Sequence, residues 1–414
     1  MTTQNLFCIF IILLVLDASF EYFLEFLNFS NRKKSLPKLI KSLFSEDSIQ
    51  KQRNYQKDNF KFGMWTGIPL QIITILIIAF QILPQIDKFL RFHIESEFWI
   101  SASFFGIILI ANQVVSIPLS AYSTFVIEER HGFNKSSLKT FILDIVKSSI
   151  LGLILFSLIF SLIFWFYSYA GNMFWLYTWA FLTAFSLFMS LFYSQLIVPL
   201  FNKQTALEEG DLKNSIADFC QKVGFKLKDI YIIDSSKRSS KTNAYFTGFG
   251  SKKRIVLYDN MLEKHTNDEI LAVLAHEIGH YKKHHIIIDL FTSIFTSGIQ
   301  LFLLGLLMNH PQLSRLLGNE VSSFHFSLIT FGLLFSFLGW ILAPLSSNLS
   351  RKHEYEADKF AADNSLGKEL KEALIKLNGD NLSNFNPHKL YVFFHYSHPT
   401  LIQRINRIDQ IIGK

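Results

Sequence analysis

The sequence predicts a mainly α-helical protein that crosses a membrane several times and carries one polar domain. Half of its 414 residues are hydrophobic, 44 are Phe and only 18% are charged. Apolar stretches of this length cannot all be buried in one soluble core, so the composition indicates a polytopic membrane protein. The apolar residues also gather in separate stretches of about 20 residues, the length that a helix needs to cross a bilayer.

Seven stretches meet that length. The first resembles a signal peptide in its opening residues. It lacks a basic n-region and a small-residue cleavage site, so we interpret it as an uncleaved span. The predicted spans are residues 5–27, 64–84, 99–122, 142–168, 174–200, 285–308 and 324–346.

The loops predict the orientation of the spans. Residues 28–63 hold nine basic residues, whereas two loops on the opposite side, 85–98 and 309–323, hold two and one. The positive-inside rule then puts 28–63, 123–141, 201–284 and the tail in the cytoplasm. The nine basic residues are Arg32, Lys33, Lys34, Lys38, Lys41, Lys51, Arg53, Lys57 and Lys61.

One sizeable polar insertion, residues 201–284, interrupts the spans, and its pattern predicts helices with a small β-sheet. We expect four parts: spans one to five (1–200), the insertion (201–284), the last two spans (285–346), and a helix and tail that complete the polar domain (347–414). The elements expected are a helix over 206–223, strands over 229–234 and 254–259 with 243–249 between them, a helix over 268–283 capped by Thr266 or Asn267, and a helix over 347–364.

Cysteine count and charge exclude two classes of site. Cys8 and Cys220 are too few for a disulfide framework or a Cys-based metal site, so any metal must be held by His and carboxylates. The net charge of +7 is explained by Lys and Arg beside the membrane, and we expect no nucleic-acid partner.

The HEIGH motif, residues 276–280, predicts a zinc site on a helix. His276 and His280 are four residues apart, so both lie on one helix face and can bind one ion. Glu277 is placed beside the open coordination position, where it can take a proton from a water on the ion. The alternative is a solvated helix face with two exposed histidines.

A third ligand is expected from residues 350–363, SRKHEYEADKFAAD. Glu354 and Asp358 are four apart on one helix face, so Glu354 can bind zinc while Asp358 hydrogen-bonds a ligand histidine from outside the coordination shell. Glu356 points to another face and is the weaker candidate. The alternative is a surface helix with paired charges.

These two motifs together resemble the type I CAAX prenyl endopeptidase family, which are integral-membrane gluzincin zinc metalloproteases. The resemblance covers nearly the whole chain. The stretch FVIEERHGFN (125–134) is particularly specific, because it separates this family from the shorter HtpX-like quality-control proteases, which share the zinc motif but have fewer spans. Other matching stretches are NYQKDNFKFGMW (54–65), VPLFNK (198–203), NAYFTGFG (243–250), LYDNML (257–262) and SHPTLIQRI (397–405).

The resemblance implies a ring of seven helices around a water-filled chamber, capped by the zinc domain. A wet chamber would explain Asp17, Glu21 and Glu25, which recur every four residues along the first span and would be costly facing lipid. The alternative is that Glu21 and Glu25 lie in the headgroup zone.

The resemblance also implies further site residues. Asn243, Ala244, Tyr245 and Phe246 match the family's substrate-binding strand, whose exposed edge would pair with an extended peptide, and Asn243 could steady the scissile carbonyl. His398 and Arg404 match its HP-x4-R element and could hold the oxyanion. The remaining histidines singled out are His131 in the EERHGF loop (128–133), His395, and His284 and His285, which are interpreted as wet interfacial residues.

The function that these observations predict is hydrolysis of a peptide bond, with one Zn²⁺ per chain and a prenylated C-terminal CAAX protein as the substrate implied by the resemblance. We expect a monomer in the endoplasmic reticulum membrane, or in the inner membrane of a bacterium. The alternatives are a broader quality-control protease, a zinc-stabilised scaffold, and a transporter. A transporter would need charges inside several spans, and beyond the first span the main candidates, Asp144 and Lys147, are expected to pair with each other at a span's end.

Overall fold

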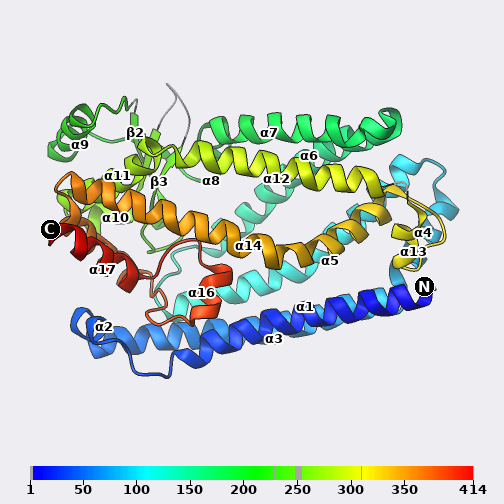
Figure 1. Ribbon diagram of the computed structural model, residues 1–414, viewed down its shortest axis with the longest axis horizontal. Helices are drawn as coiled ribbons and strands as arrows, with labels where there is room; N and C mark the ends of the chain where they lie inside the picture. The colour runs from blue at the N-terminus through cyan, green and yellow to red at the C-terminus, as the bar shows by residue number, and fades with distance from the viewer. Residues whose placement is uncertain (1–2, 228, 248–253, 309, 414) are drawn as a thin grey trace.

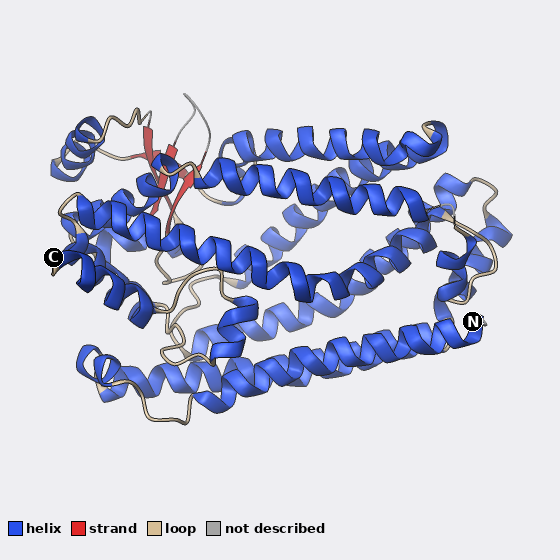
Figure 2. Cartoon of the chain, viewed as in Figure 1, coloured by secondary structure: helices blue, strands red, loops and turns tan. Residues whose placement is uncertain are grey.

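A computed structural model describes residues 3–227, 229–247, 254–308 and 310–413. The protein is mainly helical, and its long helices run side by side along one axis (Figure 1). The sheet, α9, α11 and α17 gather at one end of these helices, and α4 and α13 lie at the other end. The strands are confined to one small region (Figure 2).

Seven of the described helices are long and apolar enough to cross a membrane, which agrees with the seven predicted spans. Most extend beyond the predicted apolar stretch. The second span, for example, belongs to a helix that begins at Glu46, where the Ser45 side chain accepts a hydrogen bond from the Ser48 N–H. The seven helices are α1 (Thr3–Asn31), α3 (Glu46–Ala79), α5 (Glu97–Tyr122), α6 (Leu138–Tyr169), α7 (Phe174–Leu196), α12 (His285–Leu307) and α14 (Phe324–Asp363).

Shorter helices connect the spans and build the polar domain. The helix predicted over 206–223 begins only at Asp211, because Ala206 ends a strand and residues 207–210 form a loop. The shorter helices are α2 (Lys38–Leu43), α4 (Ile82–His93), α8 (Val198–Phe201), α9 (Asp211–Lys222), α10 (Asp259–Lys264), α11 (Asn267–Lys282), α13 (Pro311–Leu316), α15 (Gly367–Asp380), α16 (Lys389–His395) and α17 (Leu401–Ile412), with single turns or π-helical segments at Ser123–Glu128, Gly171–Met173 and Ser235–Lys237.

The sheet has four strands in the order β1-β2-β4-β3. β2 and β4 pair in parallel, and β1 and β3 pair antiparallel on either side of them. β4 lies inside the sheet, and its apolar run Ile255–Leu257 is almost fully buried, as the sequence pattern of a central strand requires. The strands are β1 (Gln204–Ala206), β2 (Asp229–Ile233), β3 (Ala244–Thr247) and β4 (Arg254–Tyr258), which confirms the two predicted strands; residues 248–250 of the NAYFTGFG stretch lie outside the described residues.

The acidic residues of the first span point to other protein segments. Asp17 accepts a hydrogen bond from Trp340 Nε1 of α14, and Glu25 accepts one from the Tyr391 hydroxyl of α16. Glu21 lies 3.3 Å from His395 Nε2, also on α16. These contacts place the three carboxylates against the C-terminal part of the chain, where α16 lies beside α1 (Figure 1).

The expected pair between Asp144 and Lys147 does not form. Asp144 binds the guanidinium of Arg238 through two hydrogen bonds of 2.7 and 2.9 Å, and Lys147 donates to the carbonyl of Leu200. A bidentate arginine contact is stronger than the exposed i,i+3 pair that spacing alone suggested.

The far end of the bundle is held by a buried polar cluster. His325 of α14 lies 2.9 Å from Ser101 Oγ and 3.0 Å from Asp87 Oδ1, and all three side chains are fully buried. Asp87 also accepts from Arg91 and Asn319. The cluster therefore fixes the start of α14 against α4 and α5.

Candidate metal centre and active site

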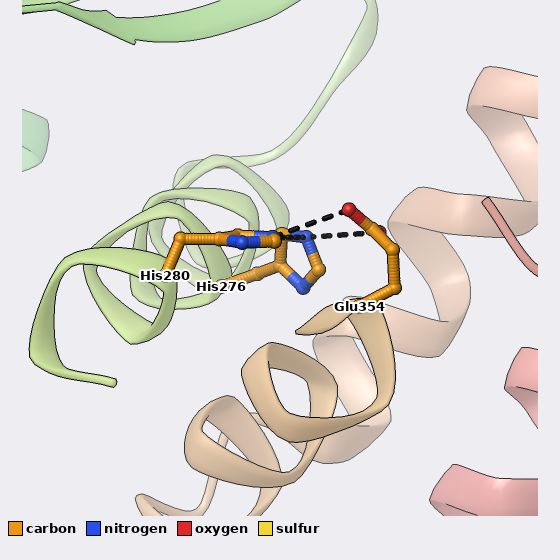
Figure 3. Close-up of side chains that lie close together, drawn as sticks. All are labelled: His276, His280 and Glu354. Atoms are coloured by element: carbon orange, nitrogen blue, oxygen red, sulfur yellow. Dashed lines mark hydrogen bonds and ion pairs between the residues drawn. The ribbon is translucent and has the colours of Figure 1, made fainter. Parts of the chain in front are cut away.

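The helix that carries HEIGH is capped and buried. Thr266 is its N-cap and forms a capping box with Glu269, so two of the helix's free N–H groups are satisfied. Most residues of α11 from Glu269 to Gly279 are buried, and the helix packs against α14 and α15. His276 and His280 project from α11 toward α14 (Figure 3).

His276, His280 and Glu354 form one compact group of metal-ligand type. The two Nε2 atoms are 3.2 Å apart, and the Glu354 carboxylate oxygens lie 3.4 Å from His276 and 3.2 Å from His280. Ligand atoms that hold one ion tetrahedrally at zinc-like bond lengths lie about 3.3–3.4 Å from each other. Among the described residues Glu354 Oε2 is buried without a hydrogen-bond partner, with His276 Nε2 and Arg404 Nη1 at 3.4 and 3.5 Å, so the donor set fits a metal ion.

Gly279 allows the two helices to approach closely enough for this group to form. A Cβ at this position would lie 3.1 Å from Ala357 Cα and 3.1 Å from Phe360 Cβ, both on α14. The contact lies one residue before His280 on α11 and three residues after Glu354 on α14. The glycine of HEIGH is therefore a packing requirement of the site, which the sequence pattern did not reveal.

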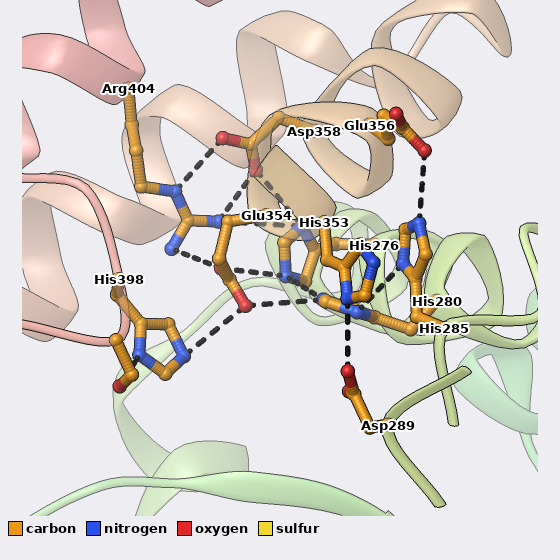
Figure 4. A network of polar contacts seen from close by, with 11 residues as sticks. His276, His280, His285, Asp289, His353, Glu354, Glu356, Asp358, His398 and Arg404 are labelled. Carbon is orange, nitrogen blue, oxygen red and sulfur yellow. Dashed lines mark hydrogen bonds and ion pairs between the residues drawn. The ribbon is translucent and has the colours of Figure 1, made fainter. Parts of the chain in front are cut away.

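Asp358 orients His276 through Nδ1, the ring nitrogen on the side away from the metal-ligand group. Its Nδ1 lies 2.9 Å from Asp358 Oδ1, and Asp358 in turn accepts two hydrogen bonds from the guanidinium of Arg404 (Figure 4). Burial and Arg404 both lower the pKa of His276, but its contacts with the Asp358 and Glu354 carboxylates outweigh them and raise that pKa to about 9. Binding of a metal would displace this proton.

His280 is oriented by a residue that we had interpreted differently. His285 is 1% exposed, so it is not a wet interfacial residue: its Nδ1 lies 3.2 Å from His280 Nδ1 and its Nε2 lies 3.0 Å from Glu356. Its ring also stacks on that of His353, at 4.0 Å between centroids. The Nδ1 atom of each ligand histidine is thus held by a residue of α14. Asp358 holds His276 directly, and Glu356 holds His280 through His285.

A cavity of about 370 Å³ opens in front of the metal-ligand group. Glu277, Asn243 and His398 line it together with His276, His280 and Glu354. His398 Nε2 lies 3.2 Å from Glu354 Oε1, and its side chain is 63% exposed (Figure 4). Arg404 also lines the cavity, so the structure brings the expected base, all three expected donors and the ligand set to one cavity.

Strand β3 presents a free edge beside this cavity, because among the described residues β4 is its only neighbour in the sheet. The Asn243 carbonyl accepts from the Tyr258 N–H, so the alternation of an antiparallel pair turns the backbone of Ala244 and Phe246 to the free edge. The Asn243 side chain itself accepts from the Ala244 N–H.

The EERHGF loop supports the segment that leads into β3. Lys241 lies 2.7 Å from a Glu128 carboxylate oxygen and 2.9 Å from the Tyr55 hydroxyl, which donates to the same carboxylate. His131, the histidine of this loop, lies 3.0 Å from Asp58 of α3. The loop thus links α3 and α5 to residues 235–242.

Comparison with known proteins gives the family. Residues 25–203 match the CAAX prenyl protease N-terminal region, with five membrane helices, and residues 206–412 match peptidase family M48. The chain is 35% identical to CAAX prenyl protease 1 homolog of Arabidopsis thaliana over 94% of both proteins, and 34% identical to CAAX prenyl protease 1 of Saccharomyces cerevisiae over 97% of this chain and 94% of the relative. The crystal structure of S. mikatae Ste24p is similar with a TM-score of 0.91 and 33% identity, over 99% of each chain.

The matched regions contain six of the seven candidate spans and the end of the first, together with the HEIGH helix and the helix of Glu354. The protein is therefore a multi-pass membrane metallopeptidase that belongs to the CAAX prenyl protease family.

Proposed function

We propose that this protein is a zinc endopeptidase that removes the last three residues from prenylated CAAX proteins. The observation that carries the proposal is the single cavity that holds the ligand set, Glu277 and the edge strand β3. The names of the relatives, CAAX prenyl protease 1, support the substrate class.

Zinc is the metal that this donor set favours. Two imidazoles and one carboxylate with an open position are typical of catalytic zinc, which lowers the pKa of water and polarises a carbonyl. His276, His280 and Glu354 would hold it, with Asp358 and His285 fixing the two imidazoles.

Four side chains would carry out proton transfer, oxyanion stabilisation and positioning. Glu277 accepts a proton from the attacking water and later donates it to the leaving nitrogen. The amine therefore leaves as a neutral group when the C–N bond breaks. His398 is the group best placed to donate to the oxyanion, and Asn243 lines the same cavity. Arg404 already binds Asp358 through two hydrogen bonds, so we assign it to holding Asp358 and Glu354 rather than to the oxyanion.

The substrate would bind as an added strand. An extended peptide that pairs with Ala244 and Phe246 would place its scissile carbonyl beside Glu277 without any side-chain-specific contact. The basic loops support a cytoplasmic position for this domain, in the endoplasmic reticulum membrane of a eukaryote.

The test uses purified protein in detergent and a matched pair of CAAX peptides, one farnesylated on Cys and one free. Mass spectrometry should detect loss of the last three residues, with the farnesylated peptide cleaved faster and with cleavage abolished by a zinc chelator. Equal rates for both peptides and for an unrelated peptide would instead support a broader quality-control protease.

A further inference from the structure

A second cavity, of about 840 Å³, adjoins the metal-ligand cavity. It lies between α1, α3, α15 and the segment that follows α16. The two cavities share lining residues, so the larger one continues directly from the metal-ligand group. The shared residues are Leu374, Leu377, His398 and Arg404.

An arginine without an acidic partner lines this cavity. Arg32 follows the end of α1, its guanidinium lies 4.0 Å from the centre of the Phe29 ring, and its Nε is buried without a hydrogen-bond partner. Among the described residues Arg32 forms no ion pair with a carboxylate within 4.0 Å, and burial together with nearby Arg53 lowers its pKa. A half-buried cation next to a second cation is costly unless an anion binds it.

The rest of the lining is suited to a peptide. Amide side chains can bind both the N–H and C=O groups of a backbone, and several of them surround the space near Arg32. One acidic residue lines the cavity, Glu25, and it is hydrogen-bonded to Tyr391. The lining amides are Asn28, Gln56, Asn59, Asn378, Asn381 and Asn384.

The direction of β3 points the C-terminal side of a bound peptide into this cavity. The start of β3 follows Thr242, whose N–H and C=O are both bonded to the side chain of Asn381, a lining residue. The other end, at Phe246, lies in a separate small cavity beside Tyr193 of α7. A peptide that pairs antiparallel to β3 therefore runs from the Phe246 end toward Asn381.

We propose that the larger cavity binds the three residues beyond the scissile bond and that Arg32 binds their terminal carboxylate. This inference rests on the function proposed above and adds a recognition site for the free C-terminus. Three extended residues span about 10 Å, and the cavity of about 840 Å³ that would hold them adjoins the metal-ligand cavity at His398 and Arg404. A carboxylate is the anion that such a peptide brings, and a guanidinium is its preferred partner.

The test compares one farnesylated CAAX peptide with its C-terminal amide, in wild type, Arg32→Gln and the control Lys33→Gln, which removes the neighbouring exposed cation. In wild type the amide should show a KM at least tenfold higher than the acid. Arg32→Gln should raise the KM of the acid to that of the amide, leave the amide unchanged and leave kcat within about twofold, the signature of lost ground-state binding. Lys33→Gln should behave as wild type.

Binding of the released tripeptide is measured separately, as a shift in thermal unfolding of the Glu277→Gln protein with and without Arg32→Gln. The tripeptide acid, but not its amide, should raise Tm only when Arg32 is present. If wild type cleaves acid and amide equally well, the carboxylate site is wrong while the protease proposal stands. If no CAAX peptide is cleaved or bound, both fail. If phosphatidylserine produces the Arg32-dependent shift and the tripeptide does not, the anion is a lipid headgroup and the inference is overturned.

Discussion

Nδ1 of His280 lies 3.2 Å from Nδ1 of His285, at the point where α11 ends and the sixth span begins. The contact joins the metal-ligand group to a residue of the membrane helix, and Glu356 holds the other nitrogen of His285. Loss of a group that orients a metal ligand typically costs 10–100-fold in metal affinity.

We therefore expect His285→Phe to weaken zinc binding by about 10–100-fold, and Glu356→Gln to weaken it less, because a glutamine can keep the hydrogen bond. The measurement is competition with a chelator at pH 7. Lys352→Gln, which removes a mostly exposed cation 3.9 Å from Glu356, serves as the control. Unchanged zinc affinity in His285→Phe would show that His280 is positioned without this contact.

Replacing Glu277 by Gln should separate binding from chemistry. Glu277 is not part of the metal-ligand group, so the variant should retain one zinc per chain by elemental analysis. Its peptide cleavage should fall by at least about 10²–10⁴-fold, the range for loss of a general base. A variant that cleaved as fast as wild type would refute the mechanism.

Gly279→Ala should push α11 away from α14. The added Cβ would meet backbone and Cβ atoms at 3.1 Å, and overpacking of this kind costs about 1–3 kcal/mol. Alanine also favours a helix by about 1 kcal/mol over glycine, so Tm should change little while zinc affinity falls. Gly152→Ala, at a helical glycine with nothing within 4 Å, is the matched control and should leave zinc affinity unchanged.

Lys241→Met should impair substrate binding from outside the cavity. The substitution removes contacts to Glu128 and Tyr55 that hold the segment before Asn243, and hydrogen bonds to charged groups contribute about 1.5–3 kcal/mol. We expect kcat/KM to fall about tenfold, mainly through KM, with zinc content unchanged. In a double-mutant cycle, Glu128→Gln should lower kcat/KM little further once Lys241→Met is present. Lys237→Met, at an exposed lysine, is the control and should leave kcat/KM unchanged. Additive losses of kcat/KM for Lys241→Met and Glu128→Gln would disprove the coupling.

The stability contributed by Glu269 should depend on pH. Burial raises the pKa of Glu269, but its hydrogen bonds to Lys376 and the Thr266 N–H lower it by more than burial raises it. The folded-state pKa therefore lies below the usual value of 4.5. A carboxyl with a depressed pKa stabilises the fold above its unfolded pKa and loses that effect as the pH falls through the folded value. Glu269→Gln should therefore lower Tm at pH 7, and the difference from wild type should shrink below about pH 4.5. A constant difference down to pH 3 would contradict this origin.

The spans and the ligand set could be predicted because each depends on local periodicity. Apolar length alone marks a span, and four-residue spacing alone puts His276 with His280 and Glu354 with Asp358 on one helix face. That the two faces meet was expected because a catalytic zinc usually takes three protein ligands, since no local pattern encodes a contact between α11 and α14.

The missed residues depend on tertiary contacts. His285 was interpreted as a wet interfacial residue, but His284 adopts a left-handed conformation with φ of 60° between α11 and α12, and His285 lies against His280. Lys241 meets Tyr55 across 186 residues, a separation at which no periodicity operates. Arg32 stands out from the other basic residues as a candidate anion site only because no carboxylate among the described residues lies near it. A sequence does not show which residues are near in space.

Helix α14 joins two fixed points across the whole bundle. At one end His325 is locked by Asp87 and Ser101, and about 44 Å further along the same helix Glu354 faces the metal-ligand histidines. Pro344 lies inside α14 between these two points, and a proline removes a backbone hydrogen bond and bends a helix. The bend separates the membrane part of α14 from the part that carries Glu354, so a bilayer of different thickness that tilts the span need not move Glu354 by the same amount.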